Sequence, residues 1–235
     1  MSLSKRVRYL RKYLADKAAF IKAGGIITDN YPIYDDFKKQ AGTVSGHYFH
    51  QDLLVARFIN QASPVRHIDV GSSIEGFVAH VASYRDIEVI DIRPLQDIGH
   101  SQIRFMQGNL MELDHSLIEI CDSLSCLHAL EHFGLGRYGD PIDPMGHLKG
   151  FNNLHKMLKM GGTLYISFPI GKSGVHFNAH RVFDPTEILE WSKGLFALVR
   201  FDYVDDAGNL TRNASLASPP VLSYGCGIYT LKKIG

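Results

Sequence analysis

Two acidic residues and a glycine have the types and spacing of a nucleoside site. A strand-like run over residues 65–70 leads into Gly71, with Asp69 just before the turn, and Asp91 ends a second such run about 20 residues after Asp69. A glycine after a strand lets a ligand approach the backbone, and an acid at this distance can bind both ribose hydroxyls. The spacing therefore indicates a nucleoside-containing cofactor.

Further residues could complete this site. Gly76 would let a helix pack closely behind the turn, and the start of that helix could offer N–H groups to a carboxylate or phosphate. Asn109 could present an amide to a base edge, and His128 ends another strand beside the expected reaction centre. We expect cofactor contacts from Asp69, Gly71, Ser72, Ser73, Gly76, Asp91, Ile92, Asn109, Leu110, Leu127 and His128.

Histidines and charged residues follow two later predicted strands, on the side where a substrate would lie. An imidazole with a pKa of about 6.5 can act as a general base at neutral pH, and His180 and His147 are the candidate catalytic bases. Others of the 12 histidines could equally be exposed or satisfied in the core. The remaining substrate-side candidates are Glu131, His132, Arg137, Asp140, Asp143, His176 and Arg181.

Two histidine pairs have the spacing of zinc ligands on a helix. His128 and His132 are four residues apart, as are His176 and His180. Neither pair has a clear third ligand, and both are expected in turns, so no metal site is predicted. The glycine- and proline-rich loop over 134–146 is either a surface turn or a lid that brings carboxylates to a polar substrate.

Alternating strands and helices must position these residues. The predicted strands cover 65–70, 87–91, 103–106, 123–127, 163–168, 196–204 and 226–232. The predicted helices cover 4–23, 48–61, 74–84 and 146–159, and a further helix opens at Asp184. This alternation predicts an α/β fold, a Rossmann-like three-layer sandwich whose seven-stranded, mostly parallel sheet has an antiparallel last strand.

The segment over 65–232 resembles the class I S-adenosylmethionine-dependent methyltransferases. The run 69–73 is similar to their glycine-rich loop, Asp91 to their ribose-binding acid, and Gly108-Asn109 to their adenine-side Gly-Asp pair. The run 121–132 is similar to their fourth-strand motif, which often ends in Leu-Glu-His. The helix end over 154–164 is also similar, and the loop over 140–144 is shared with a subgroup of unknown function.

This resemblance implies S-adenosylmethionine as the cofactor and a small polar molecule, such as a sugar or another metabolite, as the methyl acceptor. Ser73, Glu75 and Asn109 depart from the family's usual pattern. The departures at Ser73 and Asn109 motivate an alternative, a non-catalytic binding or scaffold protein that keeps the methyltransferase fold. A nicotinamide-dependent dehydrogenase would need a complete G-x-G-x-x-G motif, which the residues after Gly71 do not supply.

Composition and charge restrict the possible partners and the cellular location. The 235 residues carry a formal net charge of +1, which argues against nucleic acid as a partner, and three cysteines without a framework fit a cytoplasmic protein. Residues 1–62 are expected to form an N-terminal helical extension or cap, and residues 63–235 the methyltransferase-like Rossmann domain. The basic helix over 4–23 is expected to cap the cofactor cleft, with contact to an anionic membrane surface the less favoured alternative.

Overall fold

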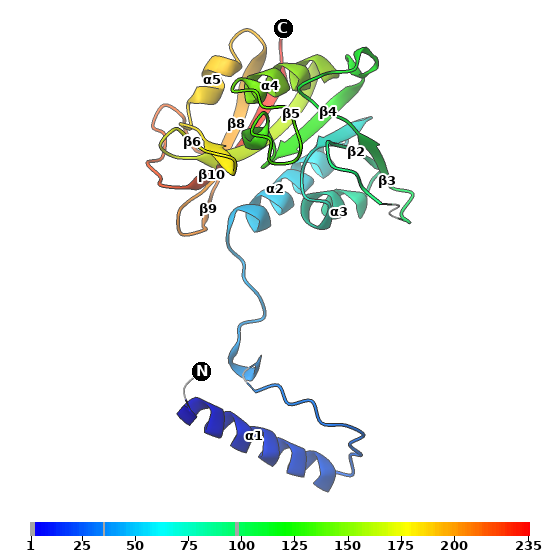
Figure 1. Ribbon diagram of the computed structural model, residues 1–235, viewed down its shortest axis with the longest axis vertical. Helices are drawn as coiled ribbons and strands as arrows, with labels where there is room; N and C mark the ends of the chain where they lie inside the picture. The colour runs from blue at the N-terminus through cyan, green and yellow to red at the C-terminus, as the bar shows by residue number, and fades with distance from the viewer. Residues whose placement is uncertain (1–2, 35, 97–98) are drawn as a thin grey trace. The chain divides into compact units, whose positions relative to one another are not determined.

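The computed structural model describes residues 3–34, 36–96 and 99–235 and divides into two compact units, Met1–Val44 and Ser45–Gly235 (Figure 1). In the smaller unit, helix α1 (Leu3–Lys22) confirms the helix predicted over 4–23, and a short 3-10 turn, η1 (Asp36–Lys38), follows it. Tyr9 of α1 packs edge to face against Phe37 of η1, with ring centroids 5.7 Å apart. The aromatic pair therefore ties the two elements together.

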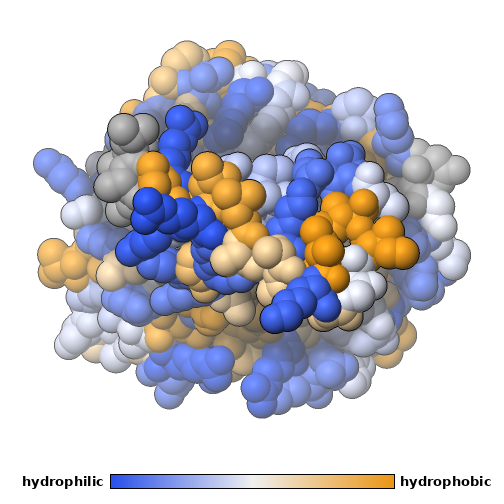
Figure 2. Space-filling view, turned by 90° about the horizontal axis from the view of Figure 1, so that it is seen from below, coloured by the Kyte–Doolittle hydropathy of each residue, from blue (hydrophilic) through white to orange (hydrophobic). Residues whose placement is uncertain are grey.

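The apolar stripe predicted on α1 is exposed. Val7, Leu10, Leu14 and Ile21 each expose 44–53% of their surface. Figure 2 shows one face of the molecule, on which hydrophobic side chains lie next to hydrophilic ones. The role of this helix as a cap remains a prediction. Within the described residues, no helix combines the length and apolarity that crossing a membrane requires.

Eight strands form one sheet in the described part of the larger unit. Their spatial order is β3 (Ile103–Gln107), β2 (Ile87–Asp91), β1 (His67–Val70), β4 (Cys121–Leu127), β5 (Leu158–Ile170), β10 (Gly225–Lys233), β8 (Phe196–Val204) and β9 (Leu210–Thr211). The first five are mutually parallel, and β10 runs antiparallel to both β5 and β8. The mostly parallel sheet and its antiparallel last strand are confirmed, with β9 as an additional two-residue edge strand.

Helices cover both faces of this sheet (Figure 1). On one face, α2 (His47–Ala62), the π-helical turn η2 (Ile74–Val78) and α3 (Ala79–Ala82) bury apolar side chains against the strands. On the other, α4 (Gly146–Met157) and α5 (Glu187–Trp191) form a second core. The three-layer arrangement is therefore confirmed. It turns the carboxyl ends of β1 to β4 toward the same edge, where open α/β sheets bind ligands.

Several local features differ from the sequence-based prediction. The helix expected over 74–84 is divided between η2 and α3, and the loop after β5 contains a small hairpin of β6 (Gly174–His176) and β7 (His180–Val182). Short 3-10 turns, η3 (His115–Leu117) and η4 (Leu130–His132), precede and follow β4. Helix α2, assigned from sequence to the extension over 1–62, lies in the larger unit.

Candidate functional site

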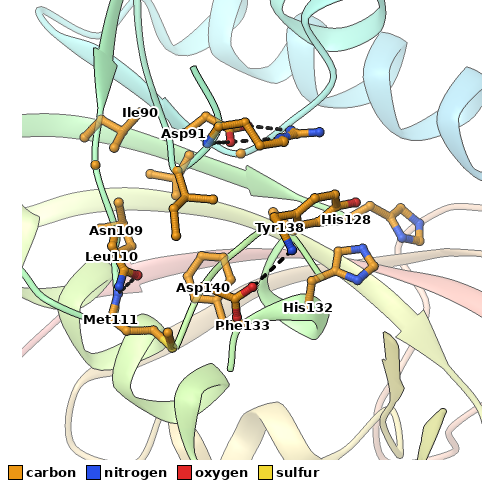
Figure 3. Close-up of a pocket in the computed structure, with 16 residues that line it drawn as sticks. Ile90, Asp91, Asn109, Leu110, Met111, His128, His132, Phe133, Tyr138 and Asp140 are labelled. Carbon is orange, nitrogen blue, oxygen red and sulfur yellow. Dashed lines mark hydrogen bonds and ion pairs between the residues drawn. The ribbon is translucent and has the colours of Figure 1, made fainter. Parts of the chain in front are cut away.

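An open cavity of about 510 Å³ lies at the carboxyl ends of β1 to β4 (Figure 3). It is lined by six of the expected cofactor residues, Gly71, Asp91, Ile92, Asn109, Leu110 and His128. A neighbouring hollow shares Gly71, Asp91 and His128 with it and adds Ser72, Ser73 and Leu127. We call these two together the strand-end cavity. The structure thus brings together most of the residues expected to hold a nucleoside.

The turn after β1 requires glycine at position 71. Gly71 has a φ of 70°, and a Cβ added there would lie 2.9 Å from the Cβ of Ala129. Its N–H donates to the carbonyl of Ile90 at 2.9 Å, which joins the turn to the end of β2. The backbone of this turn therefore approaches the cavity in a conformation that a larger residue would strain.

Asp69 lies beneath this turn instead of in the cavity. Its fully buried carboxylate accepts hydrogen bonds from the Ser72 N–H (3.0 Å) and from the hydroxyls of Ser72 (2.6 Å) and Ser125 (2.5 Å). Burial raises the pKa of Asp69 to about 6, although these hydrogen bonds act in the opposite direction. Asp69 therefore ties the turn to β4.

Gly76 also lies outside the lining of the cavity, where it makes room for α2. A Cβ at this position would lie 2.5 Å from Oδ2 of Asp52, a buried α2 residue whose pKa burial raises to about 6. The N–H of Gly76 donates to the Ser73 hydroxyl at 3.1 Å. This N–H group is therefore used within the turn and is not offered to a ligand.

Asp91 faces the cavity but has a partner within the chain (Figure 3). Nε and Nη2 of Arg93 lie 2.9 and 2.5 Å from the two carboxylate oxygens. The Arg93 guanidinium also stacks over the Tyr138 ring, 4.6 Å from its centroid. Arg93 was not among the residues expected from sequence. A ribose bound to Asp91 would have to share or displace this guanidinium.

The turn after β3 presents Asn109 and Leu110 to the same cavity. Oδ1 of Asn109 accepts the Met111 N–H at 3.0 Å, and the amide of Asn153 on α4 donates to the carbonyl of Leu110 at 2.8 Å. These bonds hold the turn in place, so that Asn109 and Leu110 form part of the cavity wall.

A second, more polar cavity of about 670 Å³ continues from the first past His128, His132 and Tyr138. Its other lining residues are His47, Tyr48, Glu131, Arg137, His180 and Tyr224, and we call it the histidine cavity. It contains Glu131, His132, Arg137 and His180 from the predicted substrate-side set.

His128 stands at the junction of the two cavities. It follows β4 with a φ of 49°, and its Nδ1 lies 2.9 Å from Oε1 of the buried Glu131. Burial by itself lowers the pKa of His128, but Cys226 and Glu131 outweigh burial and raise this pKa above its usual range. The stacked ring of His47 lies 5.4 Å away, and burial, followed by His128, lowers the pKa of His47 to about 4.

The two candidate bases lie in different surroundings. His180 lines the histidine cavity, where burial and then His176 lower its pKa. His147 instead packs against the rings of Phe183 and Trp191, with centroids 5.5 and 5.7 Å away, and burial lowers its pKa to about 4. The structure therefore does not bring His147 to the lining of either cavity.

Other predicted substrate-side residues stabilise the loop over 134–146 or lie outside the cavity walls. Asp140 borders the strand-end cavity, but its carboxylate accepts the N–H groups of Gly134 (2.7 Å) and Gly136 (3.2 Å). Asp143 pairs with Lys149 at 2.6 Å and has no place in the cavity lining. The loop is therefore a folded turn, of which Arg137, Tyr138 and Asp140 reach the cavities.

Arg181 and His176 were also expected at the substrate side. Arg181 exposes 4% of its surface and donates to the backbone carbonyls of Phe133 (2.6 Å) and Pro144 (3.3 Å). These bonds stabilise the loop over 134–146. His176 is exposed, with its ring 5.1 Å from that of His180. Neither residue lines the described cavities.

Sequence reasoning did not identify His47, Arg93, Tyr224 or Cys226 as site residues. His47 begins α2 and Cys226 lies in β10, so no local spacing connects them with the end of β4. Arg93 follows Asp91 by two residues, and an acid followed so closely by a base was the available signal for their ion pair.

Comparisons with known proteins agree on the fold. A family model described as "Caenorhabditis protein of unknown function, DUF268" matches residues 100–205, less than half of the chain, and no curated protein matches. Many solved structures match. The 1,6-didemethyltoxoflavin-N1-methyltransferase of Burkholderia thailandensis, solved with bound 1,6-didemethyltoxoflavin and S-adenosylhomocysteine, has a TM-score of 0.57 at 15% identity, and the match covers 100% of this chain and 92% of the other chain.

Two further structures show how varied the proteins with this fold are. The N-methyltransferase NodS of Bradyrhizobium japonicum WM9, in complex with S-adenosylhomocysteine, has a TM-score of 0.53 at 14% identity. The match covers 88% of this chain and 93% of the NodS chain. The [4+2]-cyclase SpnF has a TM-score of 0.58 at 15% identity and covers 100% and 98%. The chain therefore has the fold of the class I S-adenosylmethionine-dependent methyltransferases.

Proposed function

We propose that this protein is an S-adenosylmethionine-dependent methyltransferase that acts on a small polar molecule. One observation carries the proposal: Gly71, Asp91 and Asn109, from the ends of three neighbouring parallel strands, line a single cavity. The structural relatives that carry S-adenosylhomocysteine support the same cofactor. The fold alone would not suffice, because one fold hosts many activities.

The chain offers a partner for each part of the cofactor. Asp91 would accept hydrogen bonds from the ribose hydroxyls, and the Asn109–Leu110 wall would border the adenine. The turn formed by Gly71, Ser72 and Ser73 would hold the amino-acid end. The bound cofactor supplies an electrophilic methyl group, and the chain mainly has to hold this methyl group in line with the acceptor.

The histidine cavity would hold the methyl acceptor. Its lining of imidazole, carboxylate, guanidinium and phenol groups suits a molecule with several hydroxyl or amine groups, such as a sugar. His180 is the proposed base, because burial lowers its pKa and so favours the neutral imidazole at pH 7. It would take the proton that an acceptor hydroxyl or ammonium loses as the methyl group is transferred.

Calorimetric titration with S-adenosylhomocysteine tests the cofactor assignment directly. We expect one binding site, and Asp91→Asn should weaken binding by about 1.5–3 kcal/mol, or roughly 10- to 150-fold, because charge-assisted hydrogen bonds are lost. Asp86→Asn is the matched control, since this exposed acid lies just before the same strand at its opposite end. Absence of binding at millimolar ligand would reject the proposal, and an unchanged Asp91→Asn affinity would reject the ribose assignment.

The Asp91–Arg93 pair favours one competing function. A protein that keeps this ion pair closed would have no free acid for a ribose and would be a non-catalytic binding or scaffold protein. Such a protein would show no S-adenosylhomocysteine binding in the same titration. The methyltransferase proposal predicts instead that the half-exposed Arg93 yields to the ligand.

A further inference from the structure

Three metal-ligand atoms converge where two histidines of the histidine cavity lining meet a buried cysteine. They belong to His47 at the start of α2, His128 after β4, and Cys226 in β10, and all three atoms lie within 4.8 Å of one another. These residues are far apart in sequence, and the fold brings them together. Two imidazoles and a thiolate are ligands that zinc and similar transition metals prefer.

His128 has the hydrogen-bond pattern of a metal ligand. Its Nδ1 lies 2.9 Å from Oε1 of Glu131, whose side chain is 1% exposed. The side chain is only 5% exposed, and its buried Nε2 has no hydrogen-bond partner among the described residues. Metal-binding histidines commonly donate one ring N–H to a carboxylate and bind the metal through the other nitrogen.

Cys226 has no strong partner to compete with a metal. Its buried thiol contacts Oε1 of Gln51 at 3.7 Å and the carbonyl of Gly227 at 3.8 Å, and its other polar neighbour is the proposed fellow ligand His128, whose pKa it raises. Thiols are weak hydrogen-bond donors, so neither contact would offset a metal–sulfur bond.

The spacing needs only a small adjustment. Ligand atoms around a tetrahedral zinc are about 3.5 Å apart, given Zn–N bonds of about 2.0 Å and Zn–S bonds of about 2.3 Å. Moving from the observed limit of 4.8 Å requires shifts of about 1 Å, which side-chain rotation can supply.

We propose that His47, His128 and Cys226 bind a divalent metal ion of the zinc class, with its remaining coordination position open to the histidine cavity. Three protein ligands with an open position are typical of catalytic zinc sites. If the proposed methyltransferase function holds, an acceptor hydroxyl bound at this position would lose its proton to His180 more easily and become a better nucleophile. This last step rests on the proposed function, whereas metal binding does not.

Cobalt and zinc binding test the site. The full-length protein, stripped of metal with a chelator, is titrated with Co²⁺ in an absorbance cell and with Zn²⁺ in a calorimeter. We expect one equivalent of each, with a thiolate-to-cobalt charge-transfer band. Cys226→Ser should abolish that band and weaken zinc binding at least tenfold, while Cys126→Ser, at another buried cysteine, should retain both.

His47→Ala provides a second test that does not alter the core of the sheet. It should weaken zinc binding at least tenfold, whereas His176→Ala, at an exposed histidine outside the cavity lining, should not. Absence of stoichiometric binding, or unchanged binding in both Cys226→Ser and His47→Ala, would overturn the proposal. Titrating metal-free and zinc-loaded protein with S-adenosylhomocysteine separates the two ideas: nucleoside binding without metal binding overturns only the metal site, and the reverse overturns only the methyltransferase.

Discussion

A buried histidine on β1 should contribute a loss of stability in mild acid. His67 lies between two serines of β4, with Nδ1 2.8 Å from the Ser123 hydroxyl and Nε2 3.1 Å from the Ser125 hydroxyl. Burial, followed by Arg85, lowers the pKa of His67 to about 3. The folded protein therefore holds this ring neutral, while the unfolded chain would protonate it below a pH of about 6.5.

The sign and size follow from the difference in bound protons. Between pH 3 and pH 6.5 the unfolded chain binds more protons at this site, so acid favours unfolding; above pH 6.5 the contribution disappears. At pH 5 the cost is about 2 kcal/mol relative to pH 8, since each pH unit below 6.5 is worth about 1.4 kcal/mol. Asp69 and Asp52, whose pKa values burial raises to about 6, act in the opposite direction and hide this effect in the wild type.

Comparing variants isolates the contribution of His67. His67→Gln keeps a polar group for both serines but cannot titrate. The variant should therefore be less stable than the wild type at pH 8, and this difference in the free energy of unfolding should be about 2 kcal/mol smaller at pH 5. Urea unfolding followed by circular dichroism at three pH values measures the difference. His115→Gln, on the exposed turn η3, should follow the wild type throughout. A difference between His67→Gln and wild type that does not vary with pH would refute the reasoning.

Two other variants test the strand-end cavity. Gly71→Ala should destabilise the protein by about 1–3 kcal/mol and abolish S-adenosylhomocysteine binding, because a positive φ and contact with Ala129 both oppose a Cβ. Gly161→Ala is the control, because Gly161 has a similar φ of 72° but no atom near an added Cβ, so this variant measures the backbone strain alone. If both variants lost the same stability and the same binding affinity, the contact between position 71 and Ala129 would be unimportant. Arg93→Met should tighten S-adenosylhomocysteine binding two- to fivefold by freeing Asp91 from a half-exposed ion pair. Calorimetry that shows weaker binding would mean that Arg93 itself holds the ligand.

The strand-end cavity was predictable because its geometry is repeated along the sequence. Each of β1, β2 and β3 ends in a distinct residue pattern, and parallel strands carry such ends to one edge of the sheet. Gly71, Asp91 and Asn109 could therefore be expected together before any contact was known. Their local partners, such as Arg93 on Asp91, depend on side-chain geometry that the strand pattern does not encode.

The histidine cavity was only partly predictable, because residue type does not separate site from core. His147 and Arg181 have the chemistry of site residues, but aromatic rings pack against His147 and backbone carbonyls accept the hydrogen bonds of Arg181. Cys226 lies beside two cavity histidines, His47 and His128, because β10 inserts between β5 and β8 and ends the sheet's parallel run. That insertion depends on strand pairing between segments far apart in the sequence, and the residue pattern near Cys226 does not predict it.

His128 explains why the two cavities belong to one site. The residue ends β4, and its left-handed backbone turns the chain so that the strand-end cavity lies on one side and the histidine cavity on the other. A nucleoside bound at Asp91 and an acceptor held beside His180 would approach each other only past this ring. Glu131 fixes the orientation of the ring from behind. The same residue would therefore limit how the two reacting molecules meet.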